Sequence, residues 1–275
     1  MRTQELIRAA LAEDIGRCDI TTALTVGGSA LGRGRIKARE PGVISGLGIA
    51  AQVFHALDRG TMFTGTVRDS AGVRKGTLVA VVEGKAVSIL TGERTALNFL
   101  QRLSGIATLT RRFVNAVKGT GAVILDTRKT TPGWRELEKY AVRCGGGSNH
   151  RMGLYDMVLV KDNHVAAAGS VRAAVELTRD SKLPVEVEVR NLAQLREALD
   201  AGARRMLLDN MSLAQLRKAR EVAGPKVKLE ASGGINLRRV RQVAETGVDY
   251  ISVGELTHSA PALDIALDLE PVPGR

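Results

Sequence analysis

The chain has 275 residues, of which 44% are hydrophobic and only 3% aromatic, and its formal net charge is +11. This length suits one large domain or two moderate ones, and a core of Ala, Val, Leu and Ile suits parallel strands covered by helices better than a β-sandwich. The positive charge would fit a nucleic-acid-binding protein, but its cations are interleaved with acids and few aromatic residues are present to stack on bases. We therefore favour small anions as ligands.

The cysteines and the N-terminus indicate a cytoplasmic protein. Cys18 and Cys144 lie far apart and form no CxxC pair, so we expect two reduced thiols. The first residues do not have the pattern of a signal peptide, and no uninterrupted apolar stretch is long enough to cross a membrane.

The first part of the chain predicts a small, mostly antiparallel domain. Helical spacing of apolar residues predicts a helix over residues 4–13, and a polar turn follows over 14–22. Glycines then separate short β-like runs, at 35–38, 43–45, 66–69 and 78–83, around a helix-like piece at 49–57. Residues 86–117 contain no proline and have helical periodicity. We expect one long helix or two consecutive helices there, with a domain boundary near residue 105.

From about residue 120, short apolar strands alternate with helical segments. The strands end at Asp126, Lys161, Glu188, Asp209, Glu230 and Gly254. From Lys161 onward these tips follow at intervals of 27, 21, 21 and 24 residues, about one βα unit each. Such units form a parallel sheet, either doubly wound or closed into a barrel. The tips of barrel strands converge on one face, so reactive residues at nearly every tip favour a barrel, and the short segment favours fewer than eight strands.

Cationic side chains follow the early strands of this segment. They are Arg128 and Lys129 after the first tip, His150 and Arg151 after a glycine triplet, and Lys161 at a strand tip. Arginine offers a planar fork that matches a carboxylate or phosphate, whereas lysine offers a compact point charge. Each motif alone would also fit a solvated loop, and a lysine at a barrel mouth can also be a Schiff-base nucleophile. Together they predict an anion-binding site.

Carboxylates and glycines follow the later strands. Glu188 and Asp209 could hold Mg²⁺ or bind sugar hydroxyls, with structural ion pairs as the alternative. Glu186 would point to the same face of its strand as Glu188, but it lies further from the tip. The turn at 232–234 precedes a helix predicted over 237–246, and backbone N–H groups of such a turn and helix N-terminus suit a phosphate.

Longer motifs carry a closer resemblance. They are residues 93–101 and 103–108, Asp126–Gly133, Gly145–Gly147 with Asn149–Arg151, Lys161–His164, Glu186–Val189, Leu207–Asn210, Ala231–Ile235 and Gly247–Tyr250. Together they closely resemble the quinolinate phosphoribosyltransferases, over essentially the whole chain. The resemblance implies transfer of phosphoribosyl from phosphoribosyl pyrophosphate to quinolinate with Mg²⁺, giving nicotinate mononucleotide, pyrophosphate and CO₂ in NAD biosynthesis. Cys18 departs from the pattern, since the family more often has glycine there, which puts in doubt the local turn but not the activity.

The resemblance also implies an architecture and an assembly. Residues 1–105 would form an N-terminal open sandwich of sheet and helices, and residues 106–264 a C-terminal α/β barrel of parallel strands, as in type II phosphoribosyltransferases. The tail at about 265–275 would pack back on the first domain. The protein would be a homodimer with active sites at the interface, and Arg94 would reach into the site of the other subunit.

Site residues are carried over position by position from the family's motifs. The quinolinate carboxylates would be held by Arg94, Arg128, His150, Arg151 and Lys161. Phosphoribosyl pyrophosphate would contact Glu188 and Asp209 through its ribose and pyrophosphate, and Ser232, Gly233, Gly234 and Gly254 through its 5-phosphate. Thr127, Lys129 and Val253 complete the predicted set, with Lys129 at the border of the two ligands. The predicted catalytic residues are Lys129, Lys161, Glu188 and Asp209, of which the two carboxylates would hold the metal directly, through water or through substrate.

Two alternatives stay open from the sequence. One is a sibling enzyme of the same fold that acts on another anion, including the relative associated with molybdenum transport genes. The other is a non-catalytic protein that binds nucleic acid or small anions. The full cationic set argues against the first, and the carboxylates at the strand tips argue against the second.

Overall fold

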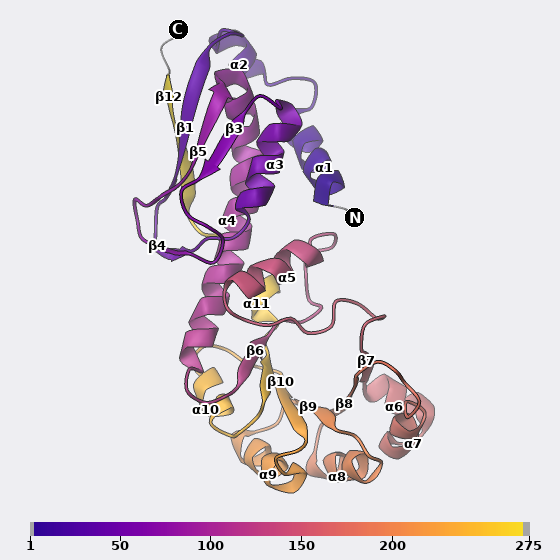
Figure 1. The fold of residues 1–275 in the computed structure, drawn as a ribbon. Helices are drawn as coiled ribbons and strands as arrows, with labels where there is room; N and C mark the ends of the chain where they lie inside the picture. Colours follow the sequence, from indigo (N-terminus) through magenta and orange to yellow (C-terminus); the bar gives the residue numbers. More distant parts are fainter. Residues whose placement is uncertain (1–2, 272–275) are drawn as a thin grey trace. The chain divides into compact units, whose positions relative to one another are not determined.

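A computed structural model describes residues 3–271 of the chain as two compact units (Figure 1). Of the described residues, the first unit contains 3–109, Pro132–Gly146 and 260–271. The second unit contains Thr110–Thr131 and Gly147–Ser259. Each unit has its own sheet, so the mixed α/β class expected from the sequence is confirmed.

The first unit is built on a four-stranded antiparallel sheet. Its strands lie in the order β12 (Ile265–Pro271), β1 (Leu31–Ala38), β5 (Leu78–Lys85) and β3 (Met62–Gly65). Seven residue pairs join β1 to β12, from Gly32 opposite Pro271 to Ala38 opposite Ile265, so the C-terminal strand belongs to the first unit. Two short strands, β2 (Gly42–Val43) and β4 (Gly72–Val73), form a separate pair.

Helices complete the first unit. They are α1 (Thr3–Ile15), α2 (Ile20–Thr25), α3 (Leu47–Leu57), α5 (Arg135–Cys144) and most of α4 (Ala86–Ala116). The predicted helices at 4–13, 49–57 and 86–117 are therefore confirmed, the last as a single helix that contains residue 105. The polar stretch at 14–22 was expected to be a turn, but a helix begins at Ile20 because the Asp19 carboxylate caps it, accepting a hydrogen bond of 3.0 Å from the Thr22 amide.

The strand predicted over residues 66–69 is wrong, because β3 ends at Gly65. The chain turns at this point, and Ser70 has a positive φ of 74°. The Asp69 carboxylate accepts hydrogen bonds from the backbone amides of Gly46 and Leu47, at 3.1 and 3.2 Å, at the start of α3. An aspartate that caps a helix favours an irregular loop over a continued strand.

Helix α5 is held to α4 by a partly buried ion pair. Arg102 donates hydrogen bonds to Glu138 Oε1 and to the Ala260 carbonyl, both at 2.9 Å, and Glu138 is fully buried. The rings of Phe99 and Trp134 stack beside this pair with centroids 4.7 Å apart. These contacts explain why a segment that interrupts the second unit in sequence belongs to the first.

The second unit contains six parallel strands. Their order is β6 (Val123–Leu125), β11 (Tyr250–Ser252), β10 (Lys228–Ser232), β9 (Arg205–Asp209), β8 (Val185–Val189) and β7 (Val158–Val160). The helices that follow them are α6 (Asp162–Ala168), α7 (Val171–Glu176), α8 (Leu192–Asp200), α9 (Leu213–Ala223), α10 (Val240–Ala244) and α11 (Glu255–His258). This is the predicted fold of parallel strands with flanking helices, an α/β barrel with six strands rather than eight (Figure 1).

Alternation along the strands decides which side chains face the interior. The apolar set Val187, Val189, Met206, Leu208, Leu229 and Ala231 is at most 1% exposed and forms one layer with the helices. The intervening residues of β8, β9 and β10 are mostly polar, and successive side chains of a strand point to opposite faces. Pairing places Ser232 beside Asp209, and Glu230 and Glu188 each beside Leu207. The polar residues of three strands therefore share the inner face.

Within residues 3–271, no helix has both the length and the apolar character that crossing a membrane requires.

Candidate active site

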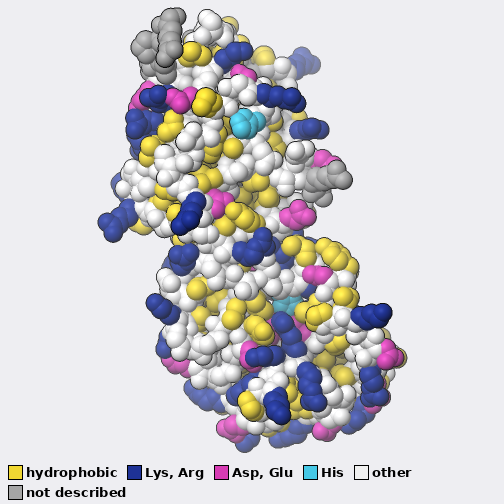
Figure 2. Space-filling model, in the orientation of Figure 1, with side chains coloured by type: hydrophobic (Ala, Val, Ile, Leu, Met, Phe, Trp, Pro, Cys, Tyr) yellow, Lys and Arg dark blue, Asp and Glu magenta, His cyan; other side chains and the backbone are white. Residues whose placement is uncertain are grey.

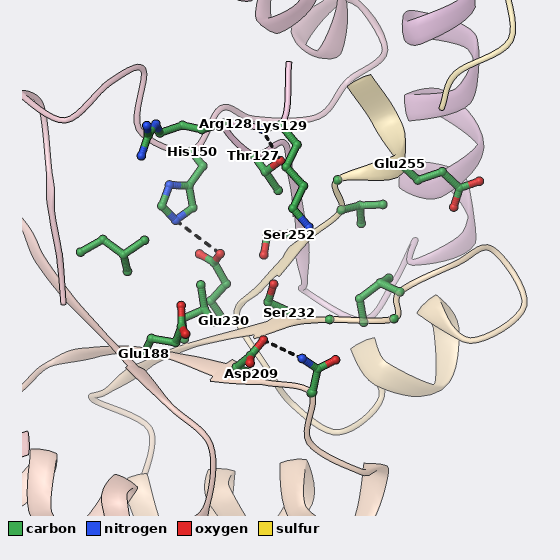
Figure 3. Close-up of a pocket in the computed structure, with 18 of the residues that line it drawn as sticks. Thr127, Arg128, Lys129, His150, Glu188, Asp209, Glu230, Ser232, Ser252 and Glu255 are labelled. Carbon is green, nitrogen blue, oxygen red and sulfur yellow. Dashed lines mark hydrogen bonds and ion pairs between the residues drawn. The ribbon is translucent and has the colours of Figure 1, made fainter. Parts of the chain in front are cut away.

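A pocket of about 900 Å³ lies within the second unit (Figure 3). It opens at the carboxyl ends of the strands, where parallel strands of an α/β barrel bring their tips together. Thirteen of the fourteen predicted site residues line it: Thr127, Arg128, Lys129, His150, Arg151, Lys161, Glu188, Asp209, Ser232, Gly233, Gly234, Val253 and Gly254. Arg94 is the exception, since it lies on α4 in the first unit with its side chain exposed.

The pocket also contains residues to which the sequence analysis assigned no role. They are Leu159, Leu207, Asn210, Glu230, Ile235, Ser252, Glu255, His258 and Ser259. Glu230 is the most informative of them. The sequence predicted a strand tip at Glu230, a signal that could have assigned it to the site, although β10 continues to Ser232.

Two arginines, Arg128 and Arg151, lie near each other at one side of the pocket. Arg151 is 8% exposed and donates a hydrogen bond of 3.1 Å to the Met157 carbonyl. Burial, followed by the positive charge of Arg128, lowers the pKa of Arg151. Within the described part of the chain, the buried Arg128 Nε has no hydrogen-bond partner. A bound anion would satisfy this donor and offset the repulsion between the two guanidinium groups.

A buried aspartate sets the backbone that carries His150 and Arg151. Asp126 directly follows β6 and is fully buried. Its carboxylate accepts hydrogen bonds from Asn149 Nδ2 at 2.6 Å and from the His150 amide at 2.8 Å. Asp126 therefore acts on the loop rather than on a ligand.

The two predicted metal-binding carboxylates each lie near a cation. Lys161 Nζ is 3.3 Å from Glu188 Oε2, and Arg190 Nε is 3.7 Å from Asp209 Oδ2. The Glu188 and Asp209 side chains are 10% and 21% exposed, so both can be reached from the pocket. Ion pairs at partly solvated sites are weak, and a ligand of higher charge can replace them.

A glycine turn follows β10 at the opposite side of the pocket. Gly233 and Gly234 have φ angles of +92° and +60°, which favour glycine. A Cβ atom on Gly233 would lie 2.2 Å from Asn210 Oδ1, so no larger residue fits there without movement. The helix expected from residue 237 begins only at Val240, because Asn236 caps an intervening turn through the amides of Arg238 and Arg239. The phosphate donors of this turn would be backbone amides rather than a helix N-terminus.

A network of four charged or titratable side chains lies at the floor of the pocket, and its Arg205 side chain is 25% exposed. Arg205 Nε lies 3.0 Å from Glu186 Oε1, and Arg205 Nη2 lies 2.9 Å from Glu230 Oε2. His150 Nε2 is 3.0 Å from Glu186 Oε2 and 3.4 Å from Glu230 Oε1. The Glu230 carboxylate points toward His150, with Ser252 and Ser232 beside it (Figure 3). Both glutamates are fully buried.

The surface agrees with a small-anion site better than with a nucleic-acid interface. Lys and Arg side chains are spread over the visible face of the second unit, with Asp and Glu side chains between them (Figure 2). The cations that differ from this pattern are those inside the pocket, where Arg128, Lys129, Arg151 and Lys161 line one cavity.

Family models and related proteins assign the chain to the same family. The model of the N-terminal domain of quinolinate phosphoribosyl transferase matches residues 19–104, and that of the C-terminal domain matches residues 106–268. The chain is 42% identical to the probable nicotinate-nucleotide pyrophosphorylase [carboxylating] of Bacillus subtilis, covering 98% of this chain and 94% of that protein. It is 47% identical to the nicotinate-nucleotide pyrophosphorylase [carboxylating] of Mycobacterium leprae, covering 97% and 96%.

A solved structure gives the same result for the fold. The crystal structure of NadC from Streptococcus pyogenes is 40% identical in sequence, has a TM-score of 0.94 and matches 98% of this chain and 96% of its own. With two domain models matched in order and relatives of this similarity over nearly the full length, the chain belongs to the quinolinate phosphoribosyltransferase family.

Proposed function

We propose that this enzyme transfers the phosphoribosyl group of phosphoribosyl pyrophosphate to quinolinate, releasing pyrophosphate and CO₂ and producing nicotinate mononucleotide for NAD biosynthesis. One observation carries the proposal: a single pocket contains a cationic side, a pair of carboxylates and a glycine turn. These three parts correspond to a dicarboxylate, a ribose and a phosphate. The names of the relatives support the same reaction.

The cationic side would select quinolinate by its two adjacent carboxylates. Arg128, Arg151 and Lys161 line the same cavity, and the two arginines already repel each other. Binding of a dianion offsets this repulsion. A monoacid such as nicotinate would leave at least one buried donor unpaired, which costs about 1–3 kcal/mol or more.

The opposite side would hold phosphoribosyl pyrophosphate. Glu188 and Asp209 would orient the ribose hydroxyls beneath a transition state in which positive charge develops on the sugar. The turn at Ser232–Gly234 and Gly254 would bind the 5-phosphate through backbone amides. Lys129 would lie between the two ligands.

We propose Mg²⁺ as the cofactor, held by Glu188 and Asp209 directly or through water and substrate oxygens. Both side chains offer carboxylate oxygens in the pocket, which are the ligands that Mg²⁺ prefers. When bound, the ion would stabilise the negative charge of the departing pyrophosphate.

Loss of CO₂ would follow from the chemistry of the ring. Once its nitrogen is bonded to ribose, the pyridine ring is positively charged and can accept the electrons that the adjacent carboxylate leaves behind. The protein then has to bind, orient and exclude water, and no covalent enzyme intermediate is needed.

We further propose a cytoplasmic homodimer in which Arg94 of the partner subunit completes the quinolinate site. Arg94 is the predicted carboxylate ligand that does not line the pocket of the second unit, and its side chain is exposed.

Substrate comparison tests the proposal. We expect kcat/KM with quinolinate to exceed that with nicotinate by at least about 100-fold, because a missing carboxylate leaves buried cations unpaired. Removal of Mg²⁺ with EDTA should stop turnover, and added Mg²⁺ should restore it. Equal or greater activity with nicotinate would favour the sibling enzyme.

A further inference from the structure

Three members of the network on the pocket floor have no role among the predicted substrate contacts: Glu186, Arg205 and Glu230. Glu186 and Glu230 share one cation, Arg205, which donates to both at 3.0 and 2.9 Å. Arg205 also stacks on the Tyr250 ring, 4.6 Å from its centroid, which holds it in place. The fourth member, His150, faces the remaining oxygen of each glutamate.

Geometry indicates that His150 is neutral. The Arg151 amide donates a hydrogen bond of 2.8 Å to His150 Nδ1, so this nitrogen carries a lone pair. The hydrogen is then on Nε2, which faces Glu186. An imidazolium would place one N–H group against another at Nδ1. His150 therefore adds no positive charge to the network.

The distribution of cations favours a proton on Glu230. Arg205 is shared by the two glutamates, and Glu186 also interacts with the charge of Arg151. An ionised Glu230 would therefore be a buried carboxylate that shares its arginine, which is costly. Burial and the neighbouring negative charge of Glu186 raise the pKa of Glu230 to about 7. Burial also opposes ionisation of Glu186, but hydrogen bonds from His150 and Arg205 hold its pKa below the usual range. The proton is therefore on Glu230.

Two buried oxygen atoms without hydrogen-bond partners in residues 3–271 are consistent with a proton on Glu230. Among the described residues, neither Glu230 Oε1 nor Ser252 Oγ has a hydrogen-bond partner of ordinary geometry, although both are buried. The two side chains lie beside each other on the pocket floor, and Ser252 counts among the groups that lower the pKa of Glu230 (Figure 3). Glu230 also lines the cavity in which the ring would bind.

The proposed reaction requires such a proton. When the carbon–carbon bond to the departing carboxylate breaks, CO₂ leaves and the electron pair stays on the ring carbon beside the positive nitrogen. A new carbon–hydrogen bond has to form there. We propose that Glu230 donates the proton that replaces the departing carboxylate, and that Glu186, Arg205, His150 and Ser252 position it. Glu230 is left as a carboxylate and regains a proton from water after product release. This step rests on the proposed function.

The lysines of the pocket are the competing donors. Lys161 is paired with Glu188 at 3.3 Å, and Lys129 also lines the cavity. If Glu230 is the donor, the rate of CO₂ release should have an alkaline limb near its pKa of about 7. Substitutions that change the pKa of Glu230 without touching the lysines therefore distinguish the two kinds of donor.

The first test is Glu230→Gln in a single-turnover quench that measures pyrophosphate and CO₂ separately. The amide keeps the shape of the side chain but is no acid. We expect pyrophosphate release within about threefold of wild type and CO₂ release slower by about 100-fold, the usual contribution of a general acid. The ribosylated dicarboxylate should accumulate between the two steps. Coupled release of both products near the wild-type rate would overturn the proposal.

The second test measures the direction in which two other substitutions move the pH profile of CO₂ release. It therefore does not require Glu230→Gln to fold. The wild-type rate of CO₂ release should fall above about pH 7. Ser252→Ala should move this limb to higher pH, because the serine lowers the pKa of Glu230. Glu186→Gln should move it to lower pH, because the charge of Glu186 raises the same pKa. A limb that stays in place in both variants would exclude Glu230 as the donor.

The two proposals fail in different ways. If wild-type enzyme releases neither pyrophosphate nor CO₂ from quinolinate and phosphoribosyl pyrophosphate, the proposed function is wrong. If it releases both, and Glu230→Gln does so equally fast, only the proton donor is wrong.

Discussion

The side-chain amide of Asn210 donates a hydrogen bond of 3.0 Å to the Asp209 carboxylate. Asn210 has a positive φ of 54°, and its backbone amide donates to the Ser232 carbonyl at 2.9 Å. Its side-chain oxygen occupies the space that a Cβ atom on Gly233 would need. One residue in a sparsely populated conformation thus links the predicted ribose carboxylate to the predicted phosphate turn.

Asn210→Ala should therefore impair binding of phosphoribosyl pyrophosphate. We expect its KM to rise about tenfold, equivalent to one hydrogen bond to a charged group, with the KM for quinolinate within threefold of wild type. Asn210→Gly tolerates the positive φ but also lacks the amide, so it separates the two effects. If the glycine variant recovers wild-type KM, backbone conformation rather than the amide is responsible.

Arg128→Ala and Lys161→Ala should each abolish turnover and leave the fold intact. Both cations line the pocket, and a dianion would lose a direct partner in each variant. Steady-state kinetics and thermal unfolding would measure the two effects. Lys218→Ala is a suitable control, because Lys218 pairs only with Glu221 on the exposed face of α9 among the interactions described. Near-wild-type turnover in either pocket variant would refute the site assignment.

Mixed dimers test whether the site is shared between subunits. Arg94→Ala and Lys161→Ala subunits should each be inactive alone. When they are combined, one of the two sites would have both residues, so part of the activity should return. Tagged subunits purified in tandem would prove that the dimers are mixed. Absence of activity in such dimers would argue against the shared site.

Asp249 should make the second unit sensitive to acid. Its carboxylate lies 2.6 Å from Lys228 Nζ and 3.2 Å from Arg220 Nη2, and it accepts a hydrogen bond of 2.9 Å from the Leu229 amide. Burial opposes ionisation, but these partners lower the pKa of Asp249 below 3.8. A lowered pKa stabilises the fold above the unfolded value, and this stabilisation is lost as the pH falls through the folded value.

Asp249→Asn should consequently cost about 2 kcal/mol of unfolding free energy at pH 7 and much less at pH 3. Urea unfolding at the two pH values would measure the difference. A cost that does not change with pH would show that the charge of Asp249 contributes little.

The strand tips could be predicted from the sequence because they depend on the pattern of neighbouring residues along the chain. Each apolar run ends where a charged or glycine residue follows, and the parallel fold then brings the tips together. Glu188 and Asp209 were found in this way, and the structure places both in the pocket.

The network on the floor could not be predicted in the same way. Its members come from the loop after β6 and from β8, β9 and β10, and their pairing depends on strand register. Glu186 and Glu188 lie on the same face of one strand, yet Glu186 is fully buried against Arg205, whereas Glu188 remains accessible. The local sequence pattern does not distinguish a fully buried glutamate from an accessible one on the same face of a strand.

Local sequence patterns could not predict which later segments belong to the first unit, because these segments are joined to it by contacts between residues far apart in the sequence. The residues of β12 pair with β1 across more than two hundred positions, and α5 is held by the Arg102–Glu138 pair. Such contacts leave no periodic signal in the segments that make them.

The most direct test of the central claim is the stoichiometry of products from quinolinate and phosphoribosyl pyrophosphate with Mg²⁺. Carboxyl-labelled quinolinate would report CO₂, while a coupled assay reports pyrophosphate and chromatography reports nicotinate mononucleotide. We predict one CO₂ and one nicotinate mononucleotide for each pyrophosphate released. Pyrophosphate release without CO₂, or no reaction with quinolinate, would contradict the account.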